Sequence, residues 1–368
     1  MLKINIVGDF RANNPGNVYF SKELSTQLAQ ADFNIVNFEA PIECGAKHQP
    51  KSGPALTQPM GSVDQLKSHG FNVFLLGNNH TMDYGLEGCQ ATLNAFSDVI
   101  TVGAGNASEA FAIKVLESEG IRIGMLSLVQ HEFGVIDYGD EGIGVAWIGS
   151  RHVEEIIRKA HEEVDYLFVF PHAGLESVDA PLPCWRDQYK RFIDYGADGV
   201  FGSHPHSPQG WEIYNGKDIF YSLGNFYFDG LGYDAPHWCN GLMVSVNVKT
   251  GGGISIDVRN TVFNSSGNVA FDLSSKTLEH IKCVNNFLAD NESYKSYITD
   301  ICRKAYGGYR YGILRSVCGT SFKVGVKFFA RLTALMLLNK SDEAYLLNVM
   351  QCETHRYVVE RALRDRLK

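Results

Sequence analysis

The chain has 368 residues, of which 45% are hydrophobic and 20% are charged. This composition supports a large buried core and excludes a globally disordered chain, and the length indicates one large domain with an extension, or two domains. The formal net charge of −8 at pH 7 disfavours general nucleic-acid binding.

The sequence carries no recognisable targeting or membrane-spanning segment. It starts with the strand-like "MLKINIVGDF", without the basic start and apolar stretch of a signal peptide. The apolar run "FFARLTALMLL" contains Arg331 and is shorter than the ~20 residues of a spanning helix. Eight widely spaced cysteines form no CxxC motif, which is typical of reduced thiols. We therefore expect a soluble, cytoplasmic protein without a transmembrane segment.

Short apolar runs alternate with amphipathic segments up to about residue 260. The runs are rich in Val, Ile and Phe and are bounded by Gly, Asn, Pro and Asp, as strands are. They cover residues 3–8, 33–38, 72–77, 121–128, 165–170, 198–202, 218–223 and 242–248. Helical patterns lie at 19–30, 151–163 and 183–196, and "KTGGG" (249–253) is typical of a hairpin turn. This alternation predicts an α/β fold with buried strands.

The character of the chain changes after about residue 275. Helical periodicity covers 276–290, 323–340 and 343–368, and residues 276–368 hold 16 basic and 9 acidic residues. We predict an α/β domain over 1–270 and a helical extension over 271–368. The favoured interpretation is a helical cap held partly by opposite charge; a weak contact of this basic tail with a membrane or an anionic polymer is the alternative.

Polar side chains follow six of the predicted strands. They are Asp9; Asn37 and Glu39; Asn78, Asn79, His80 and Asp83; His172 and Glu176; His204 and His206; and Asn225. If these strands are parallel, their carboxyl ends face one way and the side chains converge in one crevice. Carboxylate, amide and imidazole groups are ligands for Mn²⁺, Zn²⁺ or Fe, and a carboxylate can bridge two ions. The combination predicts a metal or acid/base site.

Several of these segments resemble a known family. "GDF", "NFEAPI", "GNNHTMDYG", "PHAGLE", "GSHPH" and "YSLGNF" resemble the CapA-type poly-γ-glutamate capsule-biosynthesis family, which is similar to the calcineurin-like metallophosphoesterases. The resemblance covers roughly residues 3–230. It implies a four-layer α/β/β/α sandwich, two sheets packed face to face with helices outside, with one or two divalent ions (Mn, Zn or Fe) at one edge.

The resemblance also implies roles for individual residues. Asp9 and His206 would bind the first ion, and Glu39 would take the bridging position. The second ion would bind Asn79, His172 and His204, and His80 would be the general acid. Four further residues are assigned to substrate contact or to support of the ligands: Asn37, Asp83, Glu176 and Asn225. A loop-shaping role remains open for Asp83, and a helix-cap role remains open for Glu176.

The sequence departs from the phosphoesterase pattern at two positions. Arg11 stands where those enzymes carry a histidine, and Glu39 replaces the usual bridging aspartate. Arg11 is either a catalytic residue that holds an anionic substrate group or the partner of a carboxylate such as Glu39. Lys51, in the loop 51–59, is expected to be solvated rather than to meet the substrate.

Three functions remain open. The first is a metal-dependent hydrolase with phosphoesterase-type chemistry on an anionic small molecule or polymer. The second is capsule or cell-surface polymer biosynthesis by amide transfer or polymer handling. The third is a non-catalytic binding module that lost activity through the change at Arg11.

Overall fold

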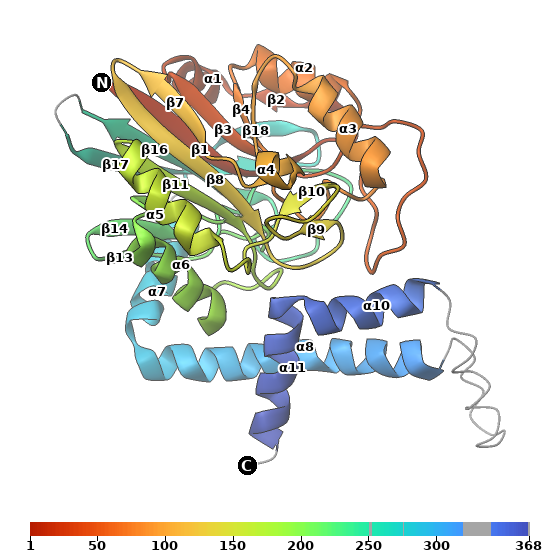
Figure 1. Cartoon of the computed structure of the whole chain (residues 1–368). Helices are drawn as coiled ribbons and strands as arrows, with labels where there is room; N and C mark the ends of the chain where they lie inside the picture. The colour runs from red at the N-terminus through yellow and green to blue at the C-terminus, as the bar shows by residue number, and fades with distance from the viewer. Residues whose placement is uncertain (250–251, 275, 319–339, 367–368) are drawn as a thin grey trace, which may run out of the picture.

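The computed structural model describes residues 1–249, 252–274, 276–318 and 340–366 and has a mixed α/β architecture with two large sheets (Figure 1). The first sheet has nine strands. Eight lie in the order β2 (Tyr19–Phe20), β18 (Asn268–Phe271), β17 (Ile254–Phe263), β16 (Asn240–Val248), β1 (Leu2–Arg11), β3 (Phe33–Phe38), β4 (Val73–Leu75) and β5 (Ile100–Val102). β16 pairs with β1 as far as Val7, and the ninth strand, β15 (Asn225–Phe228), runs parallel to β1 from Asp9 onward.

The second sheet has six strands, of which the central four are parallel. Their order is β13 (Trp211–Tyr214), β14 (Lys217–Phe220), β12 (Gly199–Phe201), β11 (Tyr166–His172), β8 (Ile121–Val129) and β7 (Lys114–Ser118). A small third sheet holds β6 (Ala104–Asn106), β10 (Ile143–Ala146) and β9 (Val135–Ile136). Because β1, β3, β4 and β5 are also mutually parallel, each large sheet has one edge at which several strands end together.

One apolar cluster is shared by the two large sheets. Ile6 of β1 and Val244 of β16 belong to the same buried group as Met125 of β8, Phe168 of β11 and Phe220 of β14. Strands that are buried on both faces read as continuous apolar runs, which explains why these segments were recognisable in the sequence. The shared core brings the carboxyl ends of both sets of parallel strands together.

Helices cover the outer side of each sheet (Figure 1). Those packed with the nine-stranded sheet are α1 (Lys22–Ala29), α2 (Gly61–Ser68) and α3 (Gly85–Ala95), and those packed with the six-stranded sheet are α5 (Val153–Glu163) and α6 (Pro183–Tyr195). The short α4 (Ala107–Ala110) contacts the small sheet, and the 3-10 turn η1 spans Pro15–Asn17. Their ends follow local rules: the Ser21 hydroxyl accepts the Leu24 N–H at the start of α1, and Gly196 ends α6 with φ 123°.

The C-terminal part is helical and lies below the sheets in Figure 1. It contains α7 (Lys276–Ala289), α8 (Asn291–Cys318), α10 (Lys340–Gln351) and α11 (Glu353–Arg366). Val284 of α7, Ile298 of α8 and Val358 of α11 share a buried cluster with Trp185 of α6, so this extension packs against the helical side of the six-stranded sheet. No helix among the described residues is both long and apolar enough to cross a membrane.

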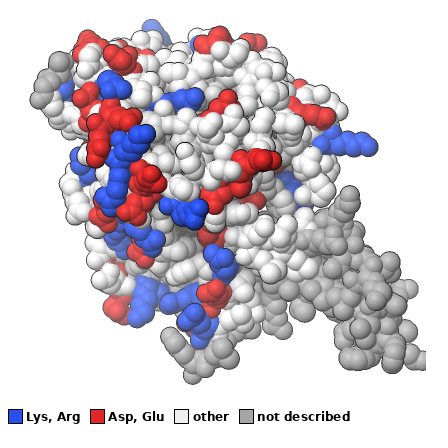
Figure 2. Space-filling view, viewed as in Figure 1, with Lys and Arg blue, Asp and Glu red and all other residues white. Residues whose placement is uncertain are grey.

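Charge on the visible face is mixed. Figure 2 shows acidic and basic side chains interspersed along the left of this face, in the region of α5 and α6. Glu154 and Arg158 of α5, for example, form an ion pair of 2.9 Å. The described part of this face therefore presents no continuous basic surface.

The sequence-based elements agree well with the structure. Each of the eight predicted strand runs contains a strand, and the three helices predicted before residue 260 correspond to α1, α5 and α6. The strands on either side of the predicted turn at 249–253, β16 and β17, are antiparallel. The α/β class is thus confirmed. The predicted helix at 323–340 lies outside the described residues except for Lys340.

Candidate metal centre

Two glycines bring the ends of β1 and β15 together. A Cβ on Gly8 would lie 1.8 Å from the carbonyl oxygen of Gly224, which itself has φ 67°. Glycine at both positions allows the Asp9 N–H to donate to the Gly224 carbonyl at 2.9 Å. Asp9 and Asn225, each directly after one of these glycines, consequently lie side by side in the pairing of β1 with β15.

Asn37 and Asn78 link the ends of β1, β3 and β4. The Asn37 Nδ2 donates to Asp9 Oδ1 at 2.7 Å, and the Asn78 Nδ2 donates to Asn37 Oδ1 at 3.1 Å. The Asn78 Oδ1 accepts the backbone N–H groups of His80 and Thr81. These amides fix both the carboxylate of β1 and the turn after β4 in buried positions.

The imidazoles come from the six-stranded sheet. His172 ends β11, whereas His204 and His206 follow β12 with φ values of 95° and 56°. Left-handed backbone at residues other than glycine costs ~1–3 kcal/mol each and persists where the surroundings impose it, commonly at functional sites. Both rings are buried, and the His206 ring contacts that of Trp238 with centroids 4.8 Å apart. The "HPH" sequence is thus held in a strained turn that directs two rings into the interior.

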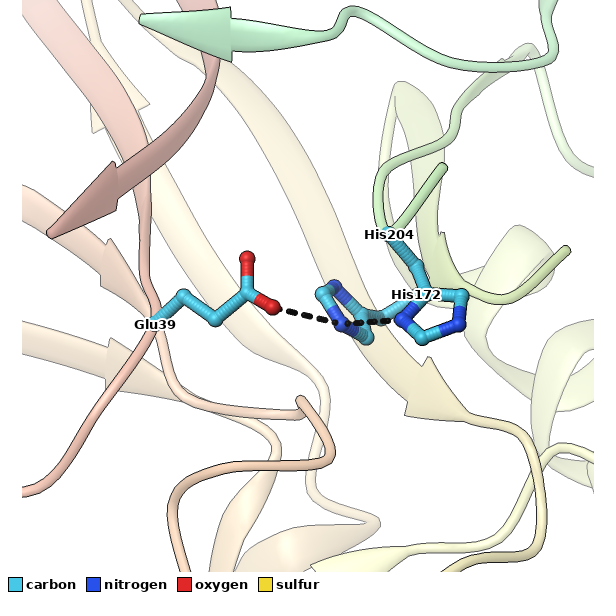
Figure 3. Close-up of side chains that lie close together, drawn as sticks. All are labelled: Glu39, His172 and His204. Carbon is cyan, nitrogen blue, oxygen red and sulfur yellow. Dashed lines mark hydrogen bonds and ion pairs between the residues drawn. The ribbon is translucent and has the colours of Figure 1, made fainter. Parts of the chain in front are cut away.

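Carboxylates and imidazoles meet in two groups that share Glu39. In each group, Asp9–Glu39–His206 and Glu39–His172–His204, the possible ligand atoms all lie within 4.8 Å of one another. Glu39 Oε1 lies 3.4 Å from His172 Nε2 and 3.6 Å from His206 Nε2. Figure 3 shows the Glu39 carboxylate facing His172, with His204 next to it.

Two of the remaining amides also contact these rings. Asn79 Oδ1 lies 2.9 Å from His172 Nε2, and Asn225 Oδ1 lies 3.0 Å from His206 Nδ1. His204 Nδ1 lies 3.2 Å from His172 Nε2. The structure therefore brings together all six residues for which the resemblance implied a metal-ligand role.

Burial and mutual charge shift the pKa values in this cluster. Burial, and then the charge of Asp9, raise the pKa of Glu39 well above its usual range. Burial lowers the pKa of His172 to about 4, and burial together with His172 lowers that of His204 to about 3. Burial also opposes a charge on His206, but Glu39 and Asp9 outweigh it and raise its pKa to about 10.

This donor set fits a divalent cation. His172 and His204 are neutral at pH 7, the form in which imidazole binds metal ions, and His206 carries a positive charge beside two carboxylates. Glu39 Oε1 is buried and accepts no hydrogen bond. A divalent ion would supply the positive charge that these oxygens require and would displace the proton of His206, because metal ligands bind in their deprotonated form.

His80 belongs to a separate buried network beside this cluster. Its Nδ1 lies 2.6 Å from Asp83 Oδ2, and Asp83 Oδ1 forms an ion pair with Lys51. The Leu56 N–H also donates to Asp83 at 2.7 Å. The expectation that Lys51 is solvated is wrong: its side chain is 3% exposed, because the carboxylate of Asp83 pairs with it inside the protein.

Arg11 and Glu176 differ from the other candidates. Arg11 Nη1 donates to the Asp229 carbonyl at 2.8 Å and lies 3.5 Å from Asp229 Oδ1, so its ion-pair partner is Asp229 rather than Glu39. Glu176 is exposed in the loop after β11 and caps no helix, because α6 begins seven residues later. Both residues lie on the periphery of the contacts described above.

Sequence reasoning missed a connection between the extension and His204. Gln130 Nε2 lies 3.0 Å from His204 Nε2, and the Thr354 hydroxyl donates to Gln130 Oε1 at 2.6 Å. Glu353, beside Thr354 at the start of α11, accepts the Trp147 indole N–H at 2.7 Å. Gln130 directly follows β8, so the strand-end rule used for the other candidates could have found it; nothing in the sequence relates α11 to this site.

Comparisons with known proteins agree with the resemblance seen in the sequence. The family described as bacterial capsule synthesis protein PGA_cap matches residues 3–230. The chain is 30% identical over 246 residues to capsule biosynthesis protein CapA of Bacillus anthracis, covering 62% of this chain and 60% of the relative. It is 31% identical over 211 residues to PGA biosynthesis protein CapA of Bacillus subtilis, covering 54% of each.

The matches leave part of each protein unaligned, since they span little more than half of these relatives' lengths. Among solved structures, TT1561 of Thermus thermophilus aligns with 70% of this chain and 98% of its own, with 7% identity and a TM-score of 0.37. The family match itself covers well over half of the chain and includes Asp9, Glu39 and the three buried histidines. The chain belongs to the bacterial capsule synthesis protein family PGA_cap.

Proposed function

We propose that this chain is a metal-dependent hydrolase with phosphoesterase-type chemistry on an anionic substrate. The observation that carries the proposal is the buried Glu39 oxygen, which lies within ion-pair distance of His172 and His206 and thereby joins two potential ligand groups. We include in the proposal a four-layer α/β/β/α sandwich for residues 1–270, supported by the core shared between the sheets and the helices outside them, with residues 271–368 as a helical extension.

In this proposal, Asp9 and His206 would hold one ion, Asn79, His172 and His204 would hold a second, and Glu39 would contribute to both groups. One or two ions of the Mn²⁺, Zn²⁺ or Fe class suit this mixture of carboxylate, amide and imidazole donors. When bound, such an ion supplies Lewis-acid activation of water and of the substrate oxygen. Asn37 and Asn225 keep Asp9 and His206 oriented through the hydrogen bonds described above.

His80 is the proposed proton donor to the leaving group. Asp83 accepts a hydrogen bond from Nδ1, which leaves Nε2 as the nitrogen that exchanges a proton with the substrate. Lys51, whose charge is paired with Asp83, lies 3.3 Å from Nδ1 of the same ring and helps to fix its position. We propose for Arg11 a positioning role, because its guanidinium holds the loop at Asp229.

The deciding experiment combines metal analysis with an activity screen. The protein purified without chelator should retain at least one equivalent of Mn, Zn or Fe and should hydrolyse phosphate monoesters or diesters. EDTA should remove both the metal and the activity, and one of the three ions should restore them. Retained metal with no hydrolysis of any ester would reject the hydrolase proposal; neither metal nor activity would reject the metal centre as well.

A second candidate is the handling or cleavage of a γ-glutamyl polymer. It is favoured by the names of the two relatives, which are described as capsule and PGA biosynthesis proteins. The same screen should therefore include γ-glutamyl amides. Release or transfer of glutamate from these amides, with inert phosphoesters, would replace the first candidate by the second.

A further inference from the structure

A second cluster of metal-binding side chains lies outside the candidate metal centre. Asp179 is in the loop between β11 and α6, His237 is in the loop between β15 and β16, and His280 is on α7. One possible ligand atom from each residue lies within 4.8 Å of those of the other two. Asp179 Oδ1 is 3.4 Å from His280 Nε2. The cluster therefore joins loops from both large sheets to the first helix of the extension.

Further features of this cluster suit a bound cation. The two imidazole rings are stacked with centroids 4.3 Å apart and an angle of 19° between their planes, an arrangement that two protonated rings would oppose. His237 adopts a left-handed backbone with φ 60°, and the buried Nε2 of His280 makes no hydrogen bond. Burial, followed by the neighbouring His280, lowers the pKa of His237, which favours its neutral form.

We propose that Asp179, His237 and His280 form a second divalent-metal site that takes Zn²⁺ or a similar borderline ion. Two imidazoles and one carboxylate are a frequent protein ligand set for zinc, with solvent or a further side chain in the fourth position. The side chains of Asp179 and His280 are 38% and 29% exposed, so an ion can reach the site from solvent. Cys283, one helical turn after His280, lines the same cavity as Asp179.

A metal at this site joins parts of the chain that are distant in sequence. His280 belongs to the extension, whereas Asp179 and His237 belong to the α/β part. The next residue, Trp238, contacts the His206 ring and accepts the Asn225 amide at its carbonyl oxygen. Metal binding here stabilises the docking of α7 and fixes the loop that supports one side of the candidate metal centre.

Zinc titration of the full chain tests the site. We would strip the protein of metal and measure bound Zn²⁺ by competition with a chromophoric chelator, together with the Zn²⁺-induced change in Tm. His237→Gln combined with His280→Gln should remove one equivalent of Zn²⁺ and reduce the Zn²⁺-induced rise in Tm. The conservative Asp179→Asn should lower the affinity for the same equivalent of Zn²⁺ by about 10-fold or more. This single variant keeps the test valid if the double variant fails to fold. His48→Gln, at an exposed histidine, is the matched control.

The two metal sites can be distinguished by combining variants. A protein with Asp9→Asn and Glu39→Gln should still bind the equivalent of Zn²⁺ that depends on His237 and His280, even if it binds no metal at the candidate metal centre. If the folded His237→Gln/His280→Gln and Asp179→Asn proteins both bind as much Zn²⁺, with the same affinity, as the His48→Gln control, the second site does not exist. That result would leave the proposed hydrolase function untouched.

Discussion

The nine-stranded sheet and the six-stranded sheet contribute different atoms to the candidate metal centre. Asp9 and Glu39 provide carboxylate oxygens from the ends of β1 and β3, whereas His172, His204 and His206 provide nitrogens from the ends of β11 and β12. Neither sheet holds a complete ligand group by itself. The ligand atoms of this centre therefore come together only when the two sheets pack against each other.

Burial shifts the pKa values of the carboxylates and of the imidazoles in opposite directions. Burial raises the pKa of Glu39 on one side and lowers those of His172 and His204 on the other, so each side resists its charged form. His206 is the exception, since its positive charge faces both carboxylates. The proximity of the two sides lessens the cost of burying these groups, and a cation between them would lessen it further.

Replacing Glu39 should have the largest effect, because this residue joins the two sides. Glu39→Gln keeps the size of the side chain but removes the charge shared by both ligand groups. We expect metal content to fall and turnover to drop by about 10³-fold or more, since metal activation supplies several kcal/mol of transition-state stabilisation. Elemental analysis and steady-state kinetics measure the two effects. Glu23→Gln, at an exposed residue of α1, is the control, and normal metal content in Glu39→Gln would contradict the shared role.

His80 should separate catalysis from metal binding. His80→Ala removes the proposed proton donor but none of the five carboxylate and imidazole ligands. Turnover should fall by about 10²-fold while metal content stays unchanged, because general acid catalysis typically contributes a factor of this size or larger. With a substrate whose leaving group needs less protonation, the turnover of His80→Ala should be closer to that of the unmodified protein. Turnover equal to that of the unmodified protein would remove His80 from the mechanism.

Loss of the contact between α11 and Gln130, which lies beside His204, should have an intermediate effect on metal binding. Thr354→Val keeps the shape of the side chain but removes the hydrogen bond to Gln130, which in turn contacts His204. Metal affinity should fall by about 10-fold, the lower end for residues that orient ligands. Metal titration measures this change, with Thr26→Val on the exposed face of α1 as control. Equal affinities in the two variants would show that the extension does not influence the imidazole side.

The smallest effect is expected at the far edge of the six-stranded sheet. Glu212 of β13 accepts two hydrogen bonds of 2.8 Å from Arg186 of α6. Burial alone would raise the pKa of Glu212, but the hydrogen bonds from Arg186 and Tyr221 lower it to about 2. The stabilisation is therefore fully present above pH ~4.5, the usual pKa of a glutamate, and is lost as the pH falls toward 2.

Glu212→Gln tests this pH dependence. At pH 6 the variant should be about 1 kcal/mol less stable to unfolding, as is typical when a hydrogen-bonded charged partner is lost. The difference in Tm between the two proteins should shrink between pH 4.5 and pH 2, while at pH 6 the two proteins should have the same metal content. A difference in Tm that stays constant from pH 4.5 to pH 2 would show that the charge of Glu212 does not contribute to stability.

Much of the fold could be predicted because buried strands have a strong local pattern. β1, β3, β8, β11 and β16 are apolar runs bounded by turn residues, and the structure has a strand in each. Two of the strands that were missed, β9 and β13, are short and only partly buried, so their composition does not distinguish them from loops. Lys51 was misjudged because its partner Asp83 is 32 residues away in the chain.

The amino-acid sequence by itself determined the α/β class, the positions of the principal strands and the kinds of polar group at their ends, because periodicity and turn residues act over a few positions. Only the tertiary structure decided that Glu39 lies between His172 and His206, that Arg11 pairs with Asp229, and that Thr354 reaches Gln130. These contacts depend on how two twisted sheets and a helical extension pack together. That packing is set by the shape of the whole apolar core rather than by any local segment.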